Sequence, residues 1–472
     1  MICLIVIFAI ARNEAISNLI FMQNRTVIYT FFILFSVANS FAQKKWTLQE
    51  CVAHAIENNV SIRQIELDNK LAEVDKKDAL GNFLPSINAS AAHSWNIGLN
   101  TNITTGILEN QTTQFTSMGA SAGIDIFRGL QHQNRYRKSK LALISSQYQH
   151  LKMEEDVALN VVNAYLQILF NKENIKVQKQ QFQADSLQLV RSEALVDAGM
   201  IPSGDLFDMK ATIATDKQRI IQAEYALLVS KMSLAQLLQM EDFKDFDIAD
   251  VEYDFQTNEI FFQTPESIYN KAKQERTELK IAENNVELAE KDVDIAKGAY
   301  LPSLTGFYSF SSRVSYAKIP DGTGGEMNPP SFWDQFDLYK GHNFGLQLNI
   351  PIFNGFTARN NVERSKINLE KTRLALEQTE LDLERDVYTA YSDAKGAMET
   401  YLATEEMLKA REEAFRYTTE RFENGMATAF DYNQSQTLLV NTQSDLLRTK
   451  YDYLFRTKIL EFYFGIPIIV RR

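Results

Sequence analysis

The chain has 472 residues, with 60 acidic and 49 basic side chains, a formal net charge of -11 and two cysteines. A chain of this length can bury more than one ordinary domain. The acidic balance argues against a nucleic-acid partner, because binding phosphate requires a basic surface.

The first 42 residues have the organisation of an export signal. Met22 precedes an apolar run over residues 27–37, and small residues then occupy the two positions that a signal peptidase reads. The pattern predicts a signal peptide over residues 1–42, with Met22 as an alternative start and a mature chain from about Gln43. A membrane anchor is the competing interpretation, but charged and polar residues interrupt it.

The rest of the chain contains one unit twice. Residues 47–86 align with residues 264–303 at a shift of 217, and beyond the first strands the shift becomes 226. The extra nine residues fall between strand-like segments, where a longer loop would lie. The pattern predicts a first structural repeat over residues 43–263 and a second over residues 264–472.

Each repeat is expected to open with one helix, over residues 47–80 and 265–297. A Leu-Pro-Ser step ends each helix, because proline disfavours the α conformation in the residue before it. A β-hairpin follows, over residues 85–128 in the first repeat and 302–353 in the second.

Within these hairpins apolar and polar residues alternate. Ile87 and Trp95 lie on one face of the first strand and Asn88 on the other, and in the last strand the alternation extends to Ile352. Such strands, about 10–14 residues long, can cross a bilayer when tilted. The polar face fits a water-filled lumen, although a sheet with one solvated face gives the same pattern. Four strands cannot close a barrel, so a barrel requires several copies of the chain.

A proline-free run of 70 steps then follows in each repeat, over residues 129–199 and 355–425. As one helix, such a run would reach roughly 100 Å. Each run ends at a glycine, typical of a C-terminal cap, and helical sequence restarts a few residues later. The sequence therefore predicts two long helical hairpins, over residues 129–239 and 355–464.

The returning helices carry an apolar residue at every seventh position, and this spacing predicts left-handed supercoiling against a neighbouring helix. These residues are Leu206, Ile213, Ile220, Leu227 and Leu234 in the first repeat, and Tyr432, Leu439, Leu446, Tyr453 and Leu460 in the second. Residues 240–263 are expected to form a small packed connector, and residues 465–472 a short tail.

The ordered set of features resembles the TolC-type outer membrane efflux factor family, over about residues 43–467. The resemblance depends on the duplicated layout, the Leu-Pro-Ser entries to the strands, the Phe-x-Gly exits at Phe127 and Phe353, and the Gly-to-Asp tips. It implies a mainly α fold with membrane β-strands. A long-helix α-barrel would continue into a β-barrel, and the three protomers of a trimer would share this barrel and contribute four strands each.

The resemblance also implies a location and a function. The protein would be a homotrimer in the outer membrane of a Gram-negative cell, in contact with lipid and extending into the periplasm. It would be the exit duct of a tripartite efflux or type I secretion system, passively conducting substrates from an inner-membrane pump joined by a periplasmic adaptor. The alternative is a periplasmic coiled-coil adaptor or scaffold protein of a transport complex.

In this family, acidic residues at the periplasmic tip surround the narrowest part of the lumen. The matching positions are Asp205 and Asp431, each six residues beyond the tip glycine. Asp208 and Gln434 follow three residues later, and Phe422 occupies the place where some members have a tyrosine. These five residues are the candidates for a constriction or gate, where like charges would favour cations and raise each other's pKa values.

Helix capping is the competing interpretation of the two first-turn aspartates. An aspartate in the first turn of a helix offsets the helix dipole, and Thr428-x-x-Asp431 resembles a capping box. Gly199, Met200, Gly425 and Met426 are the corresponding candidates for docking the adaptor, and turn geometry alone is the alternative for the glycines.

The remaining features predict no chemistry. The basic residues Arg128, Arg135, Arg137, Lys138 and Lys140 suit either the membrane edge or a solvated helix face. The five histidines lack the spacing of metal ligands, and a catalytic constellation is missing, so we expect no metal, no cofactor and no enzyme activity. The Gly-rich residues 321–325 are expected to form an external loop that no helix follows.

Overall fold

The computed structural model describes residues 45–101, 106–240, 246–250, 259–320, 322–323 and 325–466. The expected signal peptide over residues 1–42, with the alternative start at Met22, lies outside the described residues. So do most of the tail, from residue 467, and parts of the connector.

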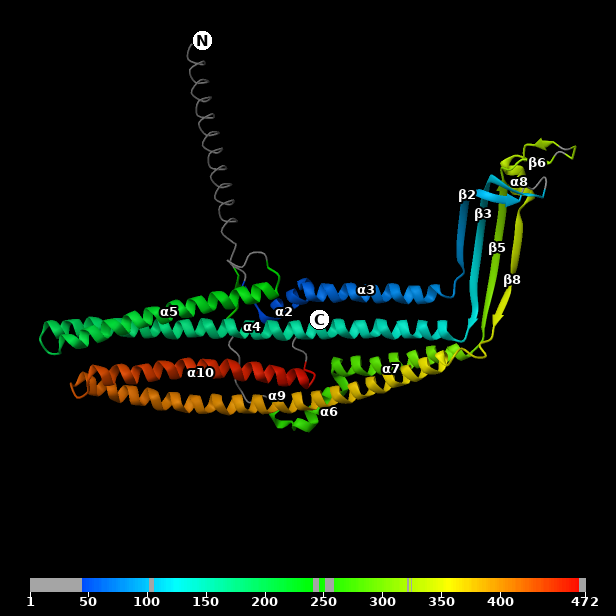
Figure 1. Ribbon diagram of the computed structural model, residues 1–472. Helices are drawn as coiled ribbons and strands as arrows, with labels where there is room; N and C mark the ends of the chain where they lie inside the picture. Colours follow the sequence, from blue (N-terminus) through cyan, green and yellow to red (C-terminus); the bar gives the residue numbers. More distant parts are fainter. Residues whose placement is uncertain are drawn as a thin grey trace, which may run out of the picture.

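Four long helices form two antiparallel hairpins: α4 (Gln131–Asp197) with α5 (Ser203–Leu237), and α9 (Thr357–Glu423) with α10 (Ala429–Tyr463). The hairpins lie side by side with both tips at the same end of the molecule (Figure 1). α4 and α9 have 67 residues each, which corresponds to roughly 100 Å. In the seven-residue stripes, Leu234 and Leu460 are fully buried, and Tyr432 and Tyr453 are buried as well.

Each opening helix is broken in two, so the expectation of one continuous helix per repeat is wrong. Asn59 and Arg276 mark the breaks, and both have an extended backbone with a ψ of 129°. Asn59 accepts a hydrogen bond from the Ser61 amide at 2.9 Å, a local bond that competes with helix continuation. The resulting helices are α2 (Leu48–Asn58), α3 (Val60–Gly81), α6 (Pro265–Glu275) and α7 (Thr277–Lys297).

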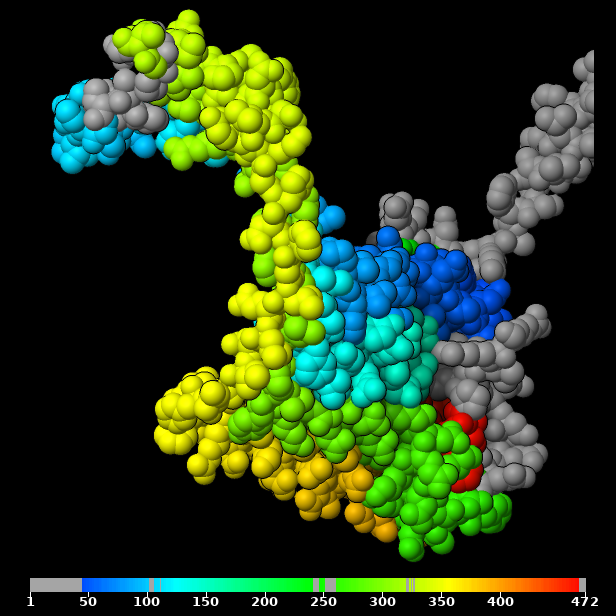
Figure 2. Space-filling view, turned by 90° about the vertical axis from the view of Figure 1, so that its right-hand side faces the viewer, coloured from blue at the N-terminus to red at the C-terminus, as the bar shows by residue number. Residues whose placement is uncertain are grey.

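A four-stranded antiparallel sheet lies at the other end of the helices, and its strands run steeply across the helix axes (Figure 1). Its order is β2-β3-β5-β8, so β2 and β8 are the edges. Figure 2 shows the sheet as a thin arm that projects from the helical body. The strands are β2 (Ser86–Thr101), β3 (Leu108–Arg128), β5 (Ser303–Ser315) and β8 (Gly341–Asn349).

The strand register reproduces the sequence repeat. Ser86 pairs with Gly123 in the first hairpin, and Ser303 pairs with Asn349 in the second. These pairs are related by the same shifts of 217 and 226 that align the sequence, since 86 + 217 = 303 and 123 + 226 = 349. The two hairpins are therefore equivalent structures, joined by the pairing of β3 with β5.

The connection between β5 and β8 differs from expectation in two ways. β8 ends at Asn349, short of the expected Ile352, and Pro351 in this segment has no amide to donate to a ladder. A short helix, α8 (Phe332–Leu338), lies in the external loop, where no helix was expected. Buried Gln335 fixes it to β5 by accepting from the Ser315 amide at 2.9 Å and donating to the Ser315 carbonyl at 3.0 Å. The small strands β6 (Ile319–Pro320) and β7 (Glu326–Met327) also belong to this loop.

The connector is paired with the first residues that the structure describes. β4 (Asp247–Ile248) pairs in parallel with β1 (Lys45–Trp46), and the 3₁₀ helix η1 (Glu259–Phe262) precedes α6. Ile248 is fully buried in a cluster with residues of α2, α4 and α5. Among the described helices, none has a stretch long and apolar enough to cross a membrane.

Two glycines form the joint between sheet and helices. Gly129 lies between β3 and α4 with a left-handed φ of 58°, and Gly298 begins the 3₁₀ helix η2 (Gly298–Tyr300) at the end of α7. A Cβ on Gly129 would collide with the Gly298 carbonyl, and a Cβ on Gly298 would collide with the Gly129 carbonyl. The two repeats can therefore approach this closely only because both positions lack a side chain.

We expect Gly129→Ala to lower the free energy of unfolding by about 2 kcal/mol or more, because alanine adds a strained backbone conformation to a steric clash. Gly204→Ala is the matched control, since Gly204 has an ordinary φ and a methyl group added there would meet nothing within 4 Å. Denaturant unfolding of both variants measures the difference. Equal stabilities would contradict the close approach.

Candidate functional site at the helical tips

Both helical tips end in the same backbone motif. The Gly199 amide donates to the Val196 carbonyl at 2.9 Å, and the Met200 amide donates to the Leu195 carbonyl at 2.8 Å. Gly425 and Met426 repeat these bonds after α9, and the two glycines have φ values of 69° and 70°. This pair of bonds is a Schellman cap, which requires the left-handed conformation that glycine adopts most easily. The turn geometry therefore accounts for both glycines, and it leaves the methionine side chains exposed.

Asp431 is the N3 residue of a complete capping box. Its carboxylate accepts from the Thr428 amide at 3.1 Å and from the Thr428 hydroxyl at 2.8 Å, while the Asp431 amide donates to the same hydroxyl oxygen at 3.1 Å. The hydrogen bond from the Thr428 side chain, followed by the bond from its backbone, lowers the pKa of Asp431. The capping role of Asp431 is thus present in the structure, with the carboxylate also exposed at the tip.

Asp205 has a different environment at the equivalent place on α5. Pro202 precedes this helix and provides no side-chain cap. Asp205 lies half-buried in the first turn, and Asp208 is exposed one turn further on. Since a reciprocal box is missing here, the first repeat has two carboxyl groups near the helix start that are not part of a Thr–Asp cap.

Phe422 packs within its own helical hairpin. The Phe422 ring packs on Tyr432 at 5.1 Å between centroids, and Phe415 packs on the same tyrosine at 5.3 Å. These contacts join α9 to α10 within one hairpin. Gln434 is exposed on α10.

The two hairpins are joined near the tips by residues that the sequence did not indicate. Arg191 of α4 forms an ion pair with Glu423 of α9 at 2.6 Å. Deeper between the helices, Gln436 of α10 donates to the buried carboxylate of Asp185 on α4. Both contacts depend on how α4 lies along the second hairpin, a relation that heptad spacing within one helix does not specify.

The basic cluster lies at the opposite end, at the end of β3 and in the first turns of α4. Arg128 pairs with Asp125 at 2.7 Å, Lys138 with Asp292 of α7 at 2.5 Å, and the ammonium of Lys140 lies over the Tyr136 ring. Part of the cluster therefore contributes to packing between helices instead of forming one solvated face.

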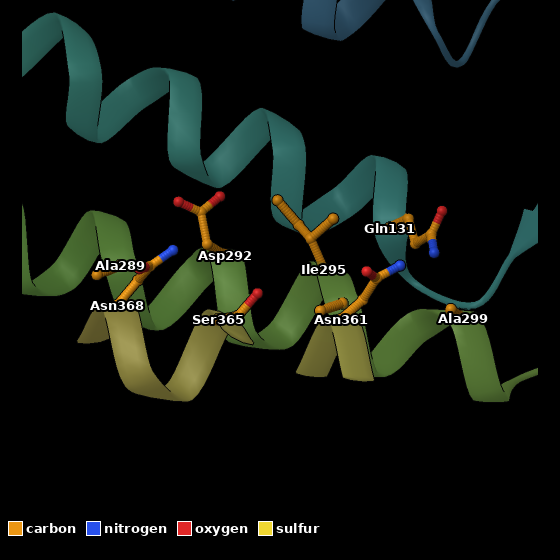
Figure 3. A pocket seen from close by; sticks show the side chains of 9 residues that line it. Gln131, Ala289, Asp292, Ile295, Ala299, Asn361, Ser365 and Asn368 are labelled. Atoms are coloured by element: carbon orange, nitrogen blue, oxygen red, sulfur yellow. The ribbon is translucent and has the colours of Figure 1, made fainter. Parts of the chain in front are cut away.

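An open cleft of about 360 Å³ adjoins the Lys138–Asp292 ion pair, between the start of α4 and helices α7 and α9 (Figure 3). Amide and hydroxyl side chains of α9 line it together with Asp292 and apolar groups of α7, and the α9 residues are Asn361, Ser365 and Asn368. Within the described part of the chain, no group of three or more histidine, cysteine or acidic residues could hold a metal ion.

The long paired helices, the edge-open sheet and the capped tips define a class of elongated proteins with a strand module at one end. Residues 52–239 and 268–465 match the family described as Outer membrane efflux protein. The chain therefore belongs to the outer membrane efflux protein family. This membership confirms the expected class and location, an efflux protein of the outer membrane that extends into the periplasm, over the adaptor or scaffold alternative. The family is one of channels, not of enzymes.

Solved structures share this fold. The outer membrane protein VceC of Vibrio cholerae matches with a TM-score of 0.73 and 14% identity, covering 89% of this chain and 96% of that one. The CmeC outer membrane channel of Campylobacter jejuni matches with a TM-score of 0.74 and 18% identity, covering 89% and 85%. A membrane protein from Pseudomonas aeruginosa matches at 0.75 and 16%, covering 88% and 90%. No curated protein matches the chain by sequence.

We expect Thr428→Ala to destabilise the first turn of α10 by about 1 kcal/mol, because it removes the oxygen that caps the helix. Hydrogen exchange of the amides of residues 429–432 measures the effect. Ser203→Ala is the control, since α5 has no side-chain cap to lose. Equal acceleration of exchange at the two helix starts would contradict the capping assignment.

The pH dependence of this cap has a definite sign. The pKa of Asp431 is lowered from its ordinary value of 3.8, so the cap stabilises the folded protein above that value. The stabilisation is lost as the pH falls through the lower pKa of the folded state. The protection of α10 in the wild type should therefore persist at neutral pH and fade in acid, and it should be weaker throughout in Thr428→Ala.

Proposed function

We propose that the chain is one protomer of a trimeric outer-membrane exit duct, which conducts substrates passively from a periplasmic pump complex to the outside. The open sheet carries this proposal. It has four strands and two edges, β2 and β8. In lipid, an edge with unpaired amides and carbonyls costs several kcal/mol for each group, so the edges require partners.

The internal repeat suggests what those partners are. Within the protomer the repeats are joined by β3 and β5, in a register that places Ser121 opposite Ser309. The shifts of 226 and 217 convert this pair into Gln347 of β8 and Ala92 of β2, since 121 + 226 = 347 and 309 − 217 = 92. A neighbouring copy of the chain can therefore repeat the β3–β5 joint with its own β2. Three copies of four strands give the twelve-stranded barrel implied by the resemblance.

In the helices, too, a contact made between the two repeats leaves its counterpart positions without that contact in a single protomer. Lys138 and Asp292 form an ion pair between the repeats, and their counterparts Arg364 and Asp75 are both exposed in the single protomer. Gly129 touches Gly298, whereas a Cβ on the counterparts Gly355 and Gly81 would meet nothing within 4 Å. In a ring, Arg364 and Gly355 of one protomer would meet Asp75 and Gly81 of the next. The opposite charges of Arg364 and Asp75 and the open space at Gly355 and Gly81 are therefore compatible with the ring, whereas like charges or bulky side chains would contradict it.

The two faces of the sheet fit a membrane channel. Large apolar residues on one face are mostly exposed, as for Ile97 at 82% and Phe344 at 77%. The opposite face carries serine, asparagine, glutamine and glycine. Exposed apolar surface on this scale is typical of a contact with lipid or protein, and the polar face suits water.

At the tips, we assign Asp205 and Asp208 to the lumen constriction and give Asp431 the capping role in addition to any contribution of its charge. The exposed Met200 and Met426 at the two turns suit the docking of an adaptor, because methionine packs on irregular partner surfaces. An efflux pump or a type I secretion pump would deliver the substrate.

The assembly can be tested with cysteine pairs, because Cys51 is fully buried and does not compete. Gln347→Cys combined with Ala92→Cys should form a disulfide between protomers, since directly opposed residues of an antiparallel pair lie about 5 Å apart. Gln347→Cys with His93→Cys is the control, because the His93 side chain points to the other face. Denaturing electrophoresis detects the covalent oligomer. Equal linkage in both variants would contradict the register.

Conduction is tested with the purified oligomer in a planar bilayer. We expect ion conductance with cation selectivity, and we expect Asp205→Asn combined with Asp208→Asn to reduce that selectivity several-fold because carboxylates at a constriction attract cations. Asp205→Glu keeps the charge and should keep the selectivity. A folded oligomer without conductance would refute the channel proposal, whereas unchanged selectivity in the double variant would refute only the constriction assignment.

A further inference from the structure

A pair of aspartates is buried in the half of the helical body nearer the tips. Asp185 of α4 is 1% exposed and Asp216 of α5 is 3% exposed. They belong to antiparallel helices joined by the turn at Gly199, and both lie about 20 Å from that turn. Buried carboxyl groups are costly unless they have partners or bind a proton.

Asp216 occupies a position where the packing of α5 normally requires an apolar residue. The seven-residue stripe of α5 is accompanied by a second one, three residues later, and all its members are buried: Met209, Asp216, Ala223 and Ser230. The two stripes together form the seam against the neighbouring helices. A carboxyl group buried at this seam reduces stability unless it is hydrogen-bonded or neutralised by a proton.

One oxygen of the two buried aspartates has no hydrogen-bond donor among the described residues. Asp185 accepts from the Gln181 side chain at 2.8 Å through one oxygen and from the Gln436 side chain through the other. The Asp216 carboxyl lies within hydrogen-bonding reach of Asp185, but its Oδ2 is buried and receives no hydrogen bond from the described residues. Two carboxylates cannot donate to each other, so the contact is complete only when one of them carries a proton.

We propose that Asp216 and Asp185 form a proton-binding site at the junction of α4, α5 and α10, in which a single proton on Asp216 is donated to Asp185 and holds α5 in place. The same proton completes a chain of hydrogen bonds from α5 through Asp185 to Gln436 on α10. The site therefore joins the first helical hairpin to the second.

The charges around the site favour the bound proton. Burial, the hydrogen bond with Asp185 and repulsion from Asp185 together raise the pKa of Asp216 to about 7. Arg219, on α5 itself, acts in the opposite direction from 4.0 Å. From α10 the titratable neighbour is Tyr432, and its pKa is raised to about 12, first by burial and then by Asp185 and by Glu423 of α9, with Arg191 of α4 opposing. The tyrosine therefore stays neutral at the pH values where Asp216 gains or loses its proton.

A proton fits these residues better than a metal ion. Gln181 and Gln436 direct amide N–H groups at Asp185, whereas a hard cation needs oxygen lone pairs around it. The site also has only two carboxyl groups, too few for the usual oxygen shell of six or more ligands.

The site belongs to the first helical hairpin and is not repeated at the matching positions of the second. The counterparts of Asp185 and Asp216 in the second repeat are Arg411 and Thr442. Because the folded protein keeps a proton on Asp216 that the unfolded chain releases near pH 3.8, the stabilisation is complete in acid and is lost as the pH rises to about 7. Around neutral pH, the packing of α5 against α4 would therefore respond to small changes in acidity.

Thermal unfolding of the full-length oligomer between about pH 5 and about pH 8.5 tests the site. The Tm of the wild type should fall by a few °C as the pH rises from about 5 to about 7 and should then level off, whereas Asp216→Asn, which donates at every pH, should not show this fall. The variant should therefore be more stable than the wild type above neutral pH, and the difference should shrink in acid. Asp197→Asn, at the exposed end of α4, is the control and should follow the wild type.

Parallel curves for the wild type and Asp216→Asn would overturn the proposal. If Asp216→Asn does not fold, Asp185→Asn provides a second test: with the like charge removed, the fall in Tm should move to lower pH, and an unmoved profile would also overturn the proposal. A Tm at high pH that rises with added calcium in the wild type but not in Asp216→Asn would assign the site to a cation instead of a proton.

Discussion

The need to pair every backbone amide and carbonyl in lipid governs the rest of this structure. A four-stranded sheet satisfies its inner ladders but leaves β2 and β8 as edges. The chain resolves a similar problem once internally, where β3 of one repeat meets β5 of the next. Because the helices continue directly from these strands, the geometry that closes the sheet also determines how neighbouring helices meet. The close contact of Gly129 with Gly298 and the Lys138–Asp292 ion pair are the helical side of that joint.

The tips follow a different constraint. Where the chain reverses direction between two helices, the terminal amides and carbonyls of those helices must be hydrogen-bonded locally. The Schellman caps at Gly199 and Gly425 satisfy the carbonyl ends in the same way in both repeats. The amide ends differ, since Thr428 and Asp431 cap α10 whereas Pro202 precedes α5. A carboxylate that caps a helix is fixed in position, whereas the carboxylates of Asp205 and Asp208 have no such cap. This difference is the reason for proposing the constriction in the first repeat.

Much of this fold follows from local sequence signals. Glycine caps, Leu-Pro-Ser steps and the repeated shifts place the long helices and the strands, because each signal acts within a few residues. The breaks at Asn59 and Arg276 could not be predicted in this way, since apolar spacing continues across them and only the extended backbone of one residue interrupts the helix. Helix α8 was missed because its stability depends on Gln335 binding the backbone of β5, a contact made across the loop. Gly-to-Asp spacing locates the tips, but the capping box of Asp431 and the missing cap at Asp205 are differences in hydrogen bonding that spacing does not specify.

The departures from symmetry between the two repeats indicate where each half has a separate task. Duplication alone would give both hairpins the same seam, yet Asp185 and Asp216 correspond to Arg411 and Thr442 in the other half. Heptad counting could have shown that Asp216 lies in the seam of α5, but its partner on α4 depends on the axial register of two long helices. Buried polar residues in helical seams often specify such a register at a cost in stability. In this chain the cost falls on the first helical hairpin alone, so the proposed proton site would make the packing of that hairpin respond to pH.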